Sequence, residues 1–439
     1  MNYYLAIDIG ASSGRHIIGY KDESNQLHCE EVYRFKNAPT LVNEHLTWDI
    51  DYLLKEVKSG IKLALEKYHE IKSMSIDTWG VDYVLIDEND NEILPCYCYR
   101  DDRTKGIINE VHKLISFENL YSITGSQFQP FNTIYQLYAD KLSGRLNNAK
   151  HFLYIPEYLM FKLTGKKVFE YTNASTSGML DCLENGYSRE IVEKLEFGKH
   201  LFKQLSKPKT IVGSFTEAVI KEVGKSIEVV LCPTHDTAAA VEGIPMVSNN
   251  PYISSGTWSL LGIKVDKVIN SCEAMQANYS NEYGPNYIRF QKNIMGLWII
   301  QNLSKQFNLD FVSMIELAKT SNYKQIYDVN DEVFLANNDI RQAIINWYFK
   351  RNMILPTNSA DIINATYHSL AYSYKEAINE LENITGEKYD CIYIVGGGAK
   401  NNYLNELTQK YTKKKVVALP IEATAIGNLL TQMEVYNER

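Results

Sequence analysis

The chain of 439 residues has no excess of positive charge, because 45 Lys and Arg stand against 53 Asp and Glu and leave a net charge of −8. Proteins that bind nucleic acid through bulk charge need a basic surface, so we expect no nucleic-acid partner. No apolar stretch approaches the roughly 18 residues that a bilayer requires. The first residues, MNYYLAIDIG, also lack the basic region of a signal peptide. We therefore expect a cytoplasmic protein with no membrane partner.

The sequence also lacks the CxxC pairs that structural zinc sites and redox sites use. Its seven cysteines are odd in number and scattered through the chain, which predicts reduced, mostly buried thiols. Cys96 and Cys98 lie two residues apart, so on a strand they share one face and are expected to pack rather than to bind a metal.

Strands and helices alternate along the chain, which predicts the α/β class. Apolar runs at 3–9, 15–20 and 27–35 are typical of three consecutive antiparallel strands. Between Trp48 and Tyr68 the apolar residues recur at helical spacing, with Thr47 or Asp49 available as N-cap. Further strands are expected at 71–77, 81–87 and 92–99.

The second half of the sequence restarts with the pattern of the first half. Residues 252–265 (YISSGTWSLLGIKV) again form an apolar run, a turn of small residues and a second apolar run. The polar stretch SNNP before them is typical of a domain boundary. We expect two related domains, 1–247 and 248–439, with chance similarity of two hairpins as the alternative.

The turns of both hairpins expose backbone N–H groups and hydroxyls that suit phosphate oxygens. The first turn carries Ser12, Ser13 and Gly14, and the second carries Ser255, Gly256 and Thr257. If two such turns hold one polyphosphate, Arg15 would add charge and Asp8 would hold a hydrated Mg²⁺. The alternative for either turn alone is a purely structural role without a bound phosphate.

A glycine cluster follows the strand expected at 391–395. Gly396, Gly397 and Gly398 precede a helix with apolar positions on one face, which is a geometry that nucleotides use. The stretch is neither a dinucleotide fingerprint nor a P-loop. A turn that only packs the helix is the alternative.

The chemistry is expected at IEVVLCPTHDTAAAV, where an apolar strand ends and an alanine-rich helix begins near Ala238. Polar side chains at the carboxyl end of a strand are where α/β folds place ligands. Asp236 is the candidate base that takes a proton from a substrate hydroxyl, with a purely N-capping role as the alternative. His235 has no second ligand at metal spacing, so we expect it to be structural or to bind a hydroxyl.

The motifs IDIGASSGR, SIDTWGVDYVLID, YRDDRT, THDTAAAV, SSGTWSLLG, KNIMGLW, IVGGGAKN and EATAIGN occur in order from residue 7 to residue 428. This series resembles that of the FGGY carbohydrate kinases. The resemblance implies a duplicated actin-like, ribonuclease-H-like fold with a cleft between its two domains. It also implies transfer of the γ-phosphoryl group of ATP, with Mg²⁺, to the 1-hydroxyl of L-rhamnulose.

Site residues follow from the same resemblance, position by position. Residues expected to bind ATP are Ala11, Ser12, Ser13, Gly14, Arg15, Thr257, Gln301 and Gly397. Residues expected to bind the sugar are Gly80, His235, Asp236, Thr237 and Asn293, with Asp236 as proton acceptor.

The sequence departs from the family pattern at its C-terminus, which ends eleven residues after Asn428. We expect a shortened second domain with apolar surface around Ile426, Leu429 and Leu430, and either a monomer or a homodimer that covers it. Two alternatives stay open. One is an FGGY kinase for another sugar such as L-fuculose or xylulose, and the other is a catalytically silent nucleotide-binding relative.

Overall fold

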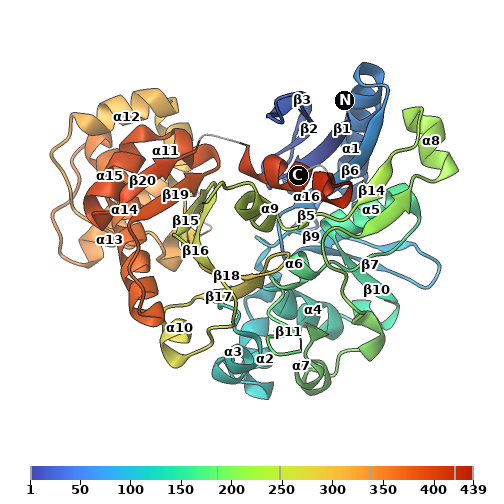
Figure 1. Cartoon of the computed structure of the whole chain (residues 1–439). Helices are drawn as coiled ribbons and strands as arrows, with labels where there is room; N and C mark the ends of the chain where they lie inside the picture. The colour runs from blue at the N-terminus through green and yellow to red at the C-terminus, as the bar shows by residue number, and fades with distance from the viewer. Residues whose placement is uncertain (1, 185, 247–248, 336–338, 420–421, 438–439) are drawn as a thin grey trace. The chain divides into compact units, whose positions relative to one another are not determined.

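The computed structural model describes residues 2–184, 186–246, 249–335, 339–419 and 422–437 (Figure 1). Contacts divide the chain into two compact units. The first comprises Met1–Pro245, Val265–Phe290 and Ala423–Arg439, and the second comprises Met246–Lys264 and Gln291–Glu422. The predicted boundary between residues 247 and 248 lies outside the described residues and stays a prediction.

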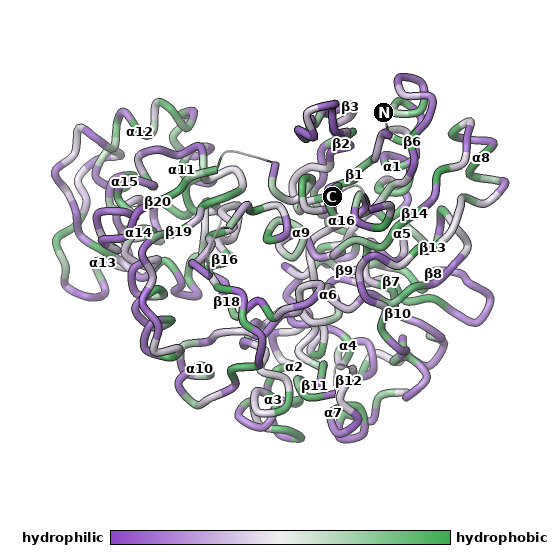
Figure 2. The backbone as a smooth tube through the Cα atoms, viewed as in Figure 1, coloured by the Kyte–Doolittle hydropathy of each residue, from purple (hydrophilic) through white to green (hydrophobic). Residues whose placement is uncertain are grey.

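The first unit is built on a six-stranded sheet with the order β13-β14-β6-β1-β2-β3. Its strands are β1 (Tyr3–Ile9), β2 (Ser13–Lys21), β3 (Leu27–Lys36), β6 (Ile71–Thr78), β13 (Ile211–Ser214) and β14 (Glu228–Val230). β1, β2 and β3 pair antiparallel in sequence order, which confirms the predicted three-stranded arrangement. β6 runs parallel to both β1 and β14. β3 forms the edge of the sheet and is largely hydrophilic in Figure 2.

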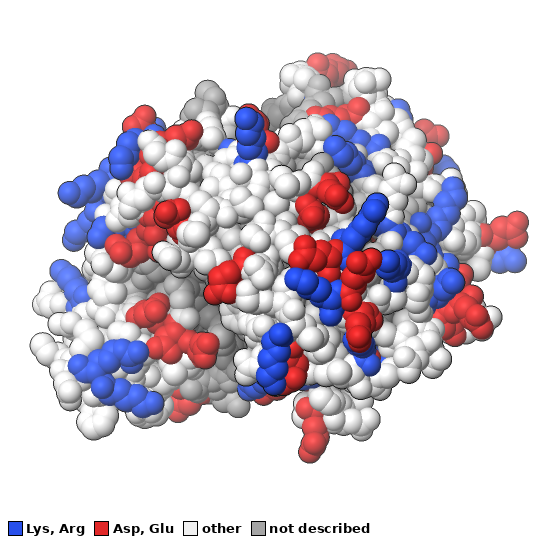
Figure 3. Space-filling view, turned by 90° about the horizontal axis from the view of Figure 1, so that it is seen from below, with Lys and Arg blue, Asp and Glu red and all other residues white. Residues whose placement is uncertain are grey.

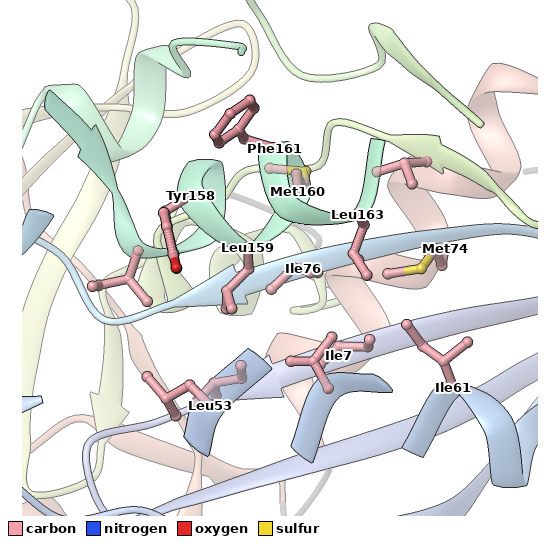
Figure 4. Close-up of a cluster of buried hydrophobic side chains, with 14 of the residues drawn as sticks. Ile7, Leu53, Ile61, Met74, Ile76, Tyr158, Leu159, Met160, Phe161 and Leu163 are labelled. Atoms are coloured by element: carbon pink, nitrogen blue, oxygen red, sulfur yellow. The ribbon is translucent and has the colours of Figure 1, made fainter. Parts of the chain in front are cut away.

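One face of this sheet is covered by α1 (Ile50–Lys67) and α5 (Ile155–Thr164). Asp49 caps α1 by accepting a hydrogen bond from the N–H of Tyr52 at 2.8 Å, which confirms one of the two predicted caps. Figure 4 shows Ile7 of β1 and Met74 and Ile76 of β6 in one buried cluster with side chains of both helices. Because side chains alternate along a strand, Asp8 and Asp77 point to the opposite face.

The opposite face is covered by the last helix, α16 (Ala423–Val435), which packs against β1 and β6 and against α9 (Asp236–Glu242). Leu429 is fully buried there with Tyr4, Ala6 and Ile17. The prediction of an exposed apolar surface around Leu429 is therefore wrong, because this helix returns to the first sheet instead of ending on the second domain. Ile426 and Leu430 are half-buried.

The two helices α9 and α16 cross at glycines. A Cβ atom on Gly427 would lie 1.8 Å from the carbonyl oxygen of Ala239, and one on Gly243 would lie 2.1 Å from that of Ala423. Real Cβ contacts are never this short, so each glycine is required for the approach of the backbones. α16 thus fixes the position of α9.

The first unit contains further short sheets and helices. The short strands are β4 (Thr40–Val42), β5 (His45–Trp48), β7 (Tyr83–Ile86), β8 (Glu92–Ile93), β9 (Cys96–Tyr97), β10 (His151–Tyr154), β11 (Leu180–Asp181) and β12 (Gly186–Tyr187). The helices are α2 (Ile107–Leu114), α3 (Phe117–Thr124), α4 (Thr133–Leu142), α6 (Tyr171–Ala174), α7 (Arg189–Lys194), α8 (Glu217–Val223), α10 (Cys272–Gln276) and the 3-10 turns η1 (Asp102–Thr104), η2 (Arg145–Asn147) and η3 (Lys199–Leu201). The strand predicted at 92–99 is divided into β8 and β9.

His16 on β2 gives the first unit a pH-dependent stability. Complete burial lowers the pKa of His16 to about 4, although its Nε2 lies 3.1 Å from the carbonyl oxygen of Val57. The unfolded chain protonates this residue near its ordinary pKa of 6.5. The neutral ring therefore contributes stability that is complete above about pH 6.5 and is lost as the pH falls toward 4.

We expect the free energy of unfolding to fall by up to about 3 kcal/mol across this window because of His16 alone. His16→Gln keeps a donor for Val57 and removes the titration, so its unfolding should depend less on pH between 6.5 and 4. Denaturant unfolding at a series of pH values measures this slope. Exposed His69→Gln is the control, and equal slopes for all three proteins would contradict the assignment.

The second sheet has the order β17-β18-β16-β15-β19-β20. Its strands are β15 (Tyr252–Ser255), β16 (Trp258–Val265), β17 (Ser280–Tyr283), β18 (Ile288–Met295), β19 (Cys391–Val395) and β20 (Lys415–Ala418). β15 and β16 form the predicted antiparallel hairpin, and β19 runs parallel to β15 and β20. The hairpin repeats the pattern of β1 and β2.

The helices of the second unit are α11 (Trp298–Phe307), α12 (Phe311–Lys319), α13 (Ile340–Lys350), α14 (Ser359–Thr385), α15 (Asn402–Thr412) and the 3-10 turns η4 (Glu332–Phe334) and η5 (Gly397–Lys400). α14 is the longest at 27 residues, is capped by Asn358, and packs against α11, α12 and α15. In the part of the chain that the structure describes, no helix combines the length and apolar character that crossing a bilayer requires.

The surface and the cysteines agree with the composition. On the face shown in Figure 3, acidic and basic side chains are intermixed, as a net charge of −8 on a chain with 22% charged residues would lead one to expect. All seven cysteines are free thiols, and Cys96 and Cys98 are both buried in the core, as predicted for packing residues.

Candidate functional site

The segment Thr234–Thr237 lies beside the carboxyl end of β6. The N–H of Thr78 donates to the carbonyl oxygen of Thr234 at 2.9 Å, and Thr78 and His235 form an isolated parallel bridge. Glu170, which is fully buried, accepts from the hydroxyl of Thr234 at 2.7 Å and also caps α6. Polar groups therefore hold this segment at the edge of the sheet where α/β folds bind ligands.

The helix α9 begins at Asp236, two residues before the predicted start, and its N-cap is His235. The alternative in which Asp236 serves as N-cap is therefore wrong, because Asp236 is the first residue of the helix. Its Oδ1 accepts from the hydroxyl of Thr237 at 3.2 Å, and its side chain is 32% exposed. A carboxylate at this position is stabilised by the helix dipole and remains accessible to a ligand.

His235 lies directly beside Asp236 and is almost completely buried. Its Nε2 is 3.4 Å from Oδ1 of Asp236, and its Nδ1 is 3.3 Å from Oε2 of Glu282 and 3.3 Å from Nη2 of Arg289. Within the described residues, no group of three His, Cys, Asp or Glu side chains could hold a metal ion. The role expected for His235, structural or hydroxyl-binding, stays a prediction.

Two more carboxylates lie on neighbouring strands at the same level, since Asp8 of β1 pairs with Asp77 of β6 in register. Arg15 donates to Oδ2 of Asp8 at 2.6 Å. Asp77 accepts from the side chain of Asn428 at 2.6 Å. Burial and the neighbouring charges of Asp8 and Asp236 raise the pKa of Asp77 well above its usual range. Asp8 and Asp77 of the first sheet, together with Asp236, therefore place three carboxylates near the start of α9.

Gly80 lies two residues beyond Thr78, in a loop that side chains hold in place. A Cβ on Gly80 would lie 2.9 Å from Oγ1 of Thr176, so a larger residue would collide there. The next residue, Val81, has a φ of 70°, which is strained for a β-branched side chain. Its N–H donates to the hydroxyl of Thr176 and its carbonyl oxygen accepts from that of Thr133.

Asp82 anchors the other end of this loop. Its buried carboxylate accepts from the indoles of Trp48 and Trp79 at 2.6 and 2.9 Å and from the side chain of Gln136 at 3.0 Å. Burial raises the pKa of Asp82 to about 6 in spite of these donors. The loop that carries Gly80 is therefore preorganised.

The first phosphate-binding candidate, the turn between β1 and β2, is accessible at its tip. Ser12 is exposed, while Ala11, Ser13 and Arg15 are half-buried. Gly14 is buried, since a Cβ there would lie 2.1 Å from the ring of Phe35. Asn37 closes the turn by donating to the carbonyl oxygen of Gly10 at 2.9 Å.

The second candidate turn, between β15 and β16, is joined to the helix that carries Gln301. The N–H groups of Leu297 and Trp298 donate to the carbonyl oxygens of Gly256 and Thr257 at 2.9 and 3.2 Å. The start of α11 is thereby held against the turn. The structure thus brings the regions of Thr257 and Gln301 together within the second unit.

The three glycines after β19 differ in role. A Cβ on Gly396 or Gly398 would collide with Ser255, at 2.7 Å from its carbonyl oxygen and 1.9 Å from its hydroxyl oxygen respectively. Gly397 is exposed and has open space around it. The α-helix does not follow the glycines directly as predicted, because η5 intervenes and Asn401 caps α15.

The predicted site residues fall into groups by unit. Gly80, His235, Asp236 and Thr237 lie in the first unit with the turn Ala11–Arg15, whereas Asn293 on β18 lies in the second unit with Thr257, Gln301 and Gly397. Sequence reasoning missed Asp77, Glu282 and Arg289, which contact or approach the candidate residues. Asp77 could have been identified because a carboxylate stands within the apolar strand SMSIDT. No pattern in the sequence indicated Glu282 or Arg289.

Both halves of the chain match one known protein family. Residues 3–243 match the N-terminal domain of the FGGY family of carbohydrate kinases, and residues 251–434 match its C-terminal domain. The chain is 42% identical to the rhamnulokinase of Oceanobacillus iheyensis, over 98% of this chain and 92% of that protein. It is 42% identical to the rhamnulokinase of Halalkalibacterium halodurans, over 100% and 94%.

Solved structures of similar fold are more distant in sequence. The ligand-bound xylulose kinase of Lactobacillus acidophilus superposes with a TM-score of 0.81 at 15% identity, covering 100% of this chain and 90% of that one. The glycerol kinase of Plasmodium falciparum with ADP gives 0.77 at 15% identity, covering 99% and 90%. At this identity the likeness concerns the fold alone, and it confirms the predicted α/β kinase fold.

Proposed function

Because this chain belongs to the FGGY family of carbohydrate kinases, we propose that it transfers the γ-phosphoryl group of ATP to the 1-hydroxyl of L-rhamnulose. The products are L-rhamnulose 1-phosphate and ADP, in the catabolism of L-rhamnose. The observation that carries the choice of sugar is 42% identity to a rhamnulokinase over 434 residues. The site supports it with an accessible carboxylate, Asp236, at the start of α9.

In this reaction Asp236 accepts the proton of the 1-hydroxyl while the oxygen forms its bond to the γ-phosphorus and the bond to the β-phosphate oxygen breaks. The loose transition state of phosphoryl transfer asks for little basicity, so a carboxylate at a helix N-terminus suffices. His235, Thr237 and Gly80 orient the sugar in the first unit, with Asn293 as a further sugar ligand. The turn Ala11–Arg15 and the residues Thr257, Gln301 and Gly397 bind ATP.

The residues present fit a hydrated magnesium ion that accompanies ATP. Asp8 and Asp77 offer carboxylate oxygens, and Oδ1 of Asp77 is buried without a hydrogen-bond partner in the described structure. Mg²⁺ prefers oxygen ligands and keeps several waters, so one or two carboxylates and the phosphates suffice to hold it. When bound, the ion neutralises charge on the phosphates. Asp8, already paired with Arg15, would contact it through water.

Sugar choice tests the proposal. We expect L-rhamnulose to have the highest kcat/KM among ketoses in a coupled ADP-release assay. L-Fructose, which adds only a 6-hydroxyl, should be modestly worse, because a methyl pocket discriminates by about 1 to 3 kcal/mol. L-Fuculose and D-xylulose should be at least about tenfold worse, since a misplaced hydroxyl leaves buried polar groups unpaired.

Asn293→Ala should raise the KM for the sugar much more than the KM for ATP. Asn346→Ala, an exposed position on α13, is the control and should change neither. Faster use of L-fuculose or D-xylulose would overturn the choice of L-rhamnulose and leave family membership intact. No phosphorylation of any ketose would favour a catalytically silent relative.

We further propose that the enzyme acts in the cytoplasm, as a monomer or homodimer, with the sugar and ATP as its small-molecule partners. Free thiols at all seven cysteines suit a reducing compartment. Size-exclusion chromatography with light scattering measures the oligomeric state directly.

A further inference from the structure

Behind His235 lie two buried charged residues that the proposed reaction does not use. Glu282 on β17 is 4% exposed, and Arg289 on β18 is 0% exposed. Nη2 of Arg289 lies 3.2 Å from Oε2 of Glu282, so the two form an ion pair. Both belong to the first unit, as does His235.

Hydrogen bonds and ring stacking hold the guanidinium of Arg289 in place. The guanidinium of Arg289 donates through Nε and Nη2 to the carbonyl oxygen of Tyr283, at 3.4 and 3.3 Å. The N–H of Tyr283 donates to the hydroxyl of Ser175, and its ring stacks on that of Tyr171 with centroids 4.4 Å apart. The position of the guanidinium is therefore well defined.

Stability does not account for this ion pair. Removing two charges from water costs free energy that their mutual attraction seldom exceeds, so a buried pair adds little to folding compared with apolar residues of similar size. Oε2 of Glu282 and Nη2 of Arg289 each lie 3.3 Å from Nδ1 of His235, which indicates that the ion pair acts on this imidazole.

The surroundings of the imidazole determine where its proton lies. Nε2 faces the carboxylate of Asp236 at 3.4 Å, and because a carboxylate only accepts, a proton on Nε2 complements this contact. Nδ1 lies 3.3 Å from Oε2 of Glu282 and 3.3 Å from Nη2 of Arg289, with which it forms a hydrogen bond. A guanidinium only donates, so Nδ1 is the unprotonated acceptor in this hydrogen bond. Glu282 balances the charge of Arg289.

We propose that Glu282 and Arg289 are positioning residues that hold His235 with Nδ1 as acceptor and with its proton on Nε2. In that form His235 presents its one N–H on the side of Asp236, where an oxygen of the bound sugar would accept it in place of the carboxylate. Asp236 then remains able to accept the proton of the reacting hydroxyl. This inference rests on the proposed function for its kinetic part, but the tautomer can be measured without any substrate.

The first test is the ¹⁵N NMR spectrum of protein labelled at histidine, with His235→Asn used to assign the resonances. We expect an unprotonated Nδ1 and a protonated Nε2 at His235. In Arg289→Gln the carboxylate of Glu282 faces Nδ1 without its cation, so the proton should appear on Nδ1. A proton on Nδ1 in the unmodified protein would overturn the proposal.

The second test is a double-mutant cycle on sugar kinetics. Arg289→Gln should raise the KM for the sugar about tenfold, with the KM for ATP changed less than about twofold. In the His235→Asn background the same substitution should have little effect on kcat/KM for the sugar. Equal losses in both backgrounds would show that Arg289 acts only on the fold and would contradict the proposal.

Two further variants keep the test decisive. If Arg289→Gln alone does not fold, the double variant Glu282→Gln/Arg289→Gln replaces it, because it removes both charges and leaves no unpaired buried charge. Its effect on the KM for the sugar should likewise disappear in the His235→Asn background. Glu242→Gln is the matched control, because Glu242 on α9 accepts from the hydroxyl of Tyr287, which lies in the same segment Val265–Phe290 as Glu282 and Arg289. It should leave sugar kinetics unchanged. If the unmodified protein phosphorylates no ketose, the proposed function fails while the tautomer result still decides this inference.

Discussion

Asp236→Asn is expected to lower kcat by about 10² to 10⁴, because the amide keeps the shape of the side chain and cannot accept the proton of the 1-hydroxyl. The KM for ATP and the melting temperature should remain near those of the unmodified protein, since Asp236 is the first residue of α9 and not its N-cap. Steady-state kinetics with L-rhamnulose and ATP measure the loss.

Asp51→Asn is a matched control for this experiment. Asp51 also lies in the first turn of a helix, α1, so its replacement removes the same favourable interaction with a helix dipole at an exposed position. Its turnover should be normal. A variant at position 236 with near-normal turnover would show that Asp236 is not the proton acceptor.

Gly427→Ala is expected to lower the free energy of unfolding by about 3 kcal/mol, at the upper end of overpacking effects. The new Cβ would lie 1.8 Å from the carbonyl oxygen of Ala239, so α16 must move away from α9. Because α9 carries Asp236, turnover should fall as well. Unfolding in denaturant and steady-state kinetics provide the two measurements.

Gly106→Ala is the control for the added methyl group. Gly106 has an ordinary φ of −83°, and a Cβ atom added there would have nothing within 4 Å, so its stability should change by less than about 0.5 kcal/mol. Gly243→Ala probes the same helix crossing from the other side, at 2.1 Å from Ala423. Normal stability of both Gly427→Ala and Gly243→Ala would contradict the close approach of α9 and α16.

Local patterns predicted the local structure well. The helical spacing of apolar residues gave α1 within two residues of its ends, and the two hairpins were found from their apolar runs and small turns. These features depend on neighbours in the chain. The predicted start of α15 directly after the glycines is wrong. Gly396 and Gly398 pack closely against Ser255, and the local sequence pattern does not reveal this contact.

Long-range packing explains what the sequence could not show. Leu429 was expected at the surface, yet it packs against Gly19, some four hundred residues earlier. Glu282 and Arg289 approach His235 only because β17 and the first residues of β18 belong to the first unit with the segment Val265–Phe290. Candidate ligands within motifs could be named in advance, whereas residues that orient them from elsewhere in the chain could not.

The return of α16 to the first sheet has a consequence for synthesis on the ribosome. Gln432 forms hydrogen bonds with Ser73 and with the carbonyl oxygen of Leu5, and Asn428 forms one with Asp77. β1 and β6 therefore complete these contacts only after α16 has been synthesised. Chains usually fold domain by domain as they emerge. Here the face of β1, β6 and α9 that α16 covers stays exposed while the whole second unit is translated, so the nascent chain presents apolar surface during that interval.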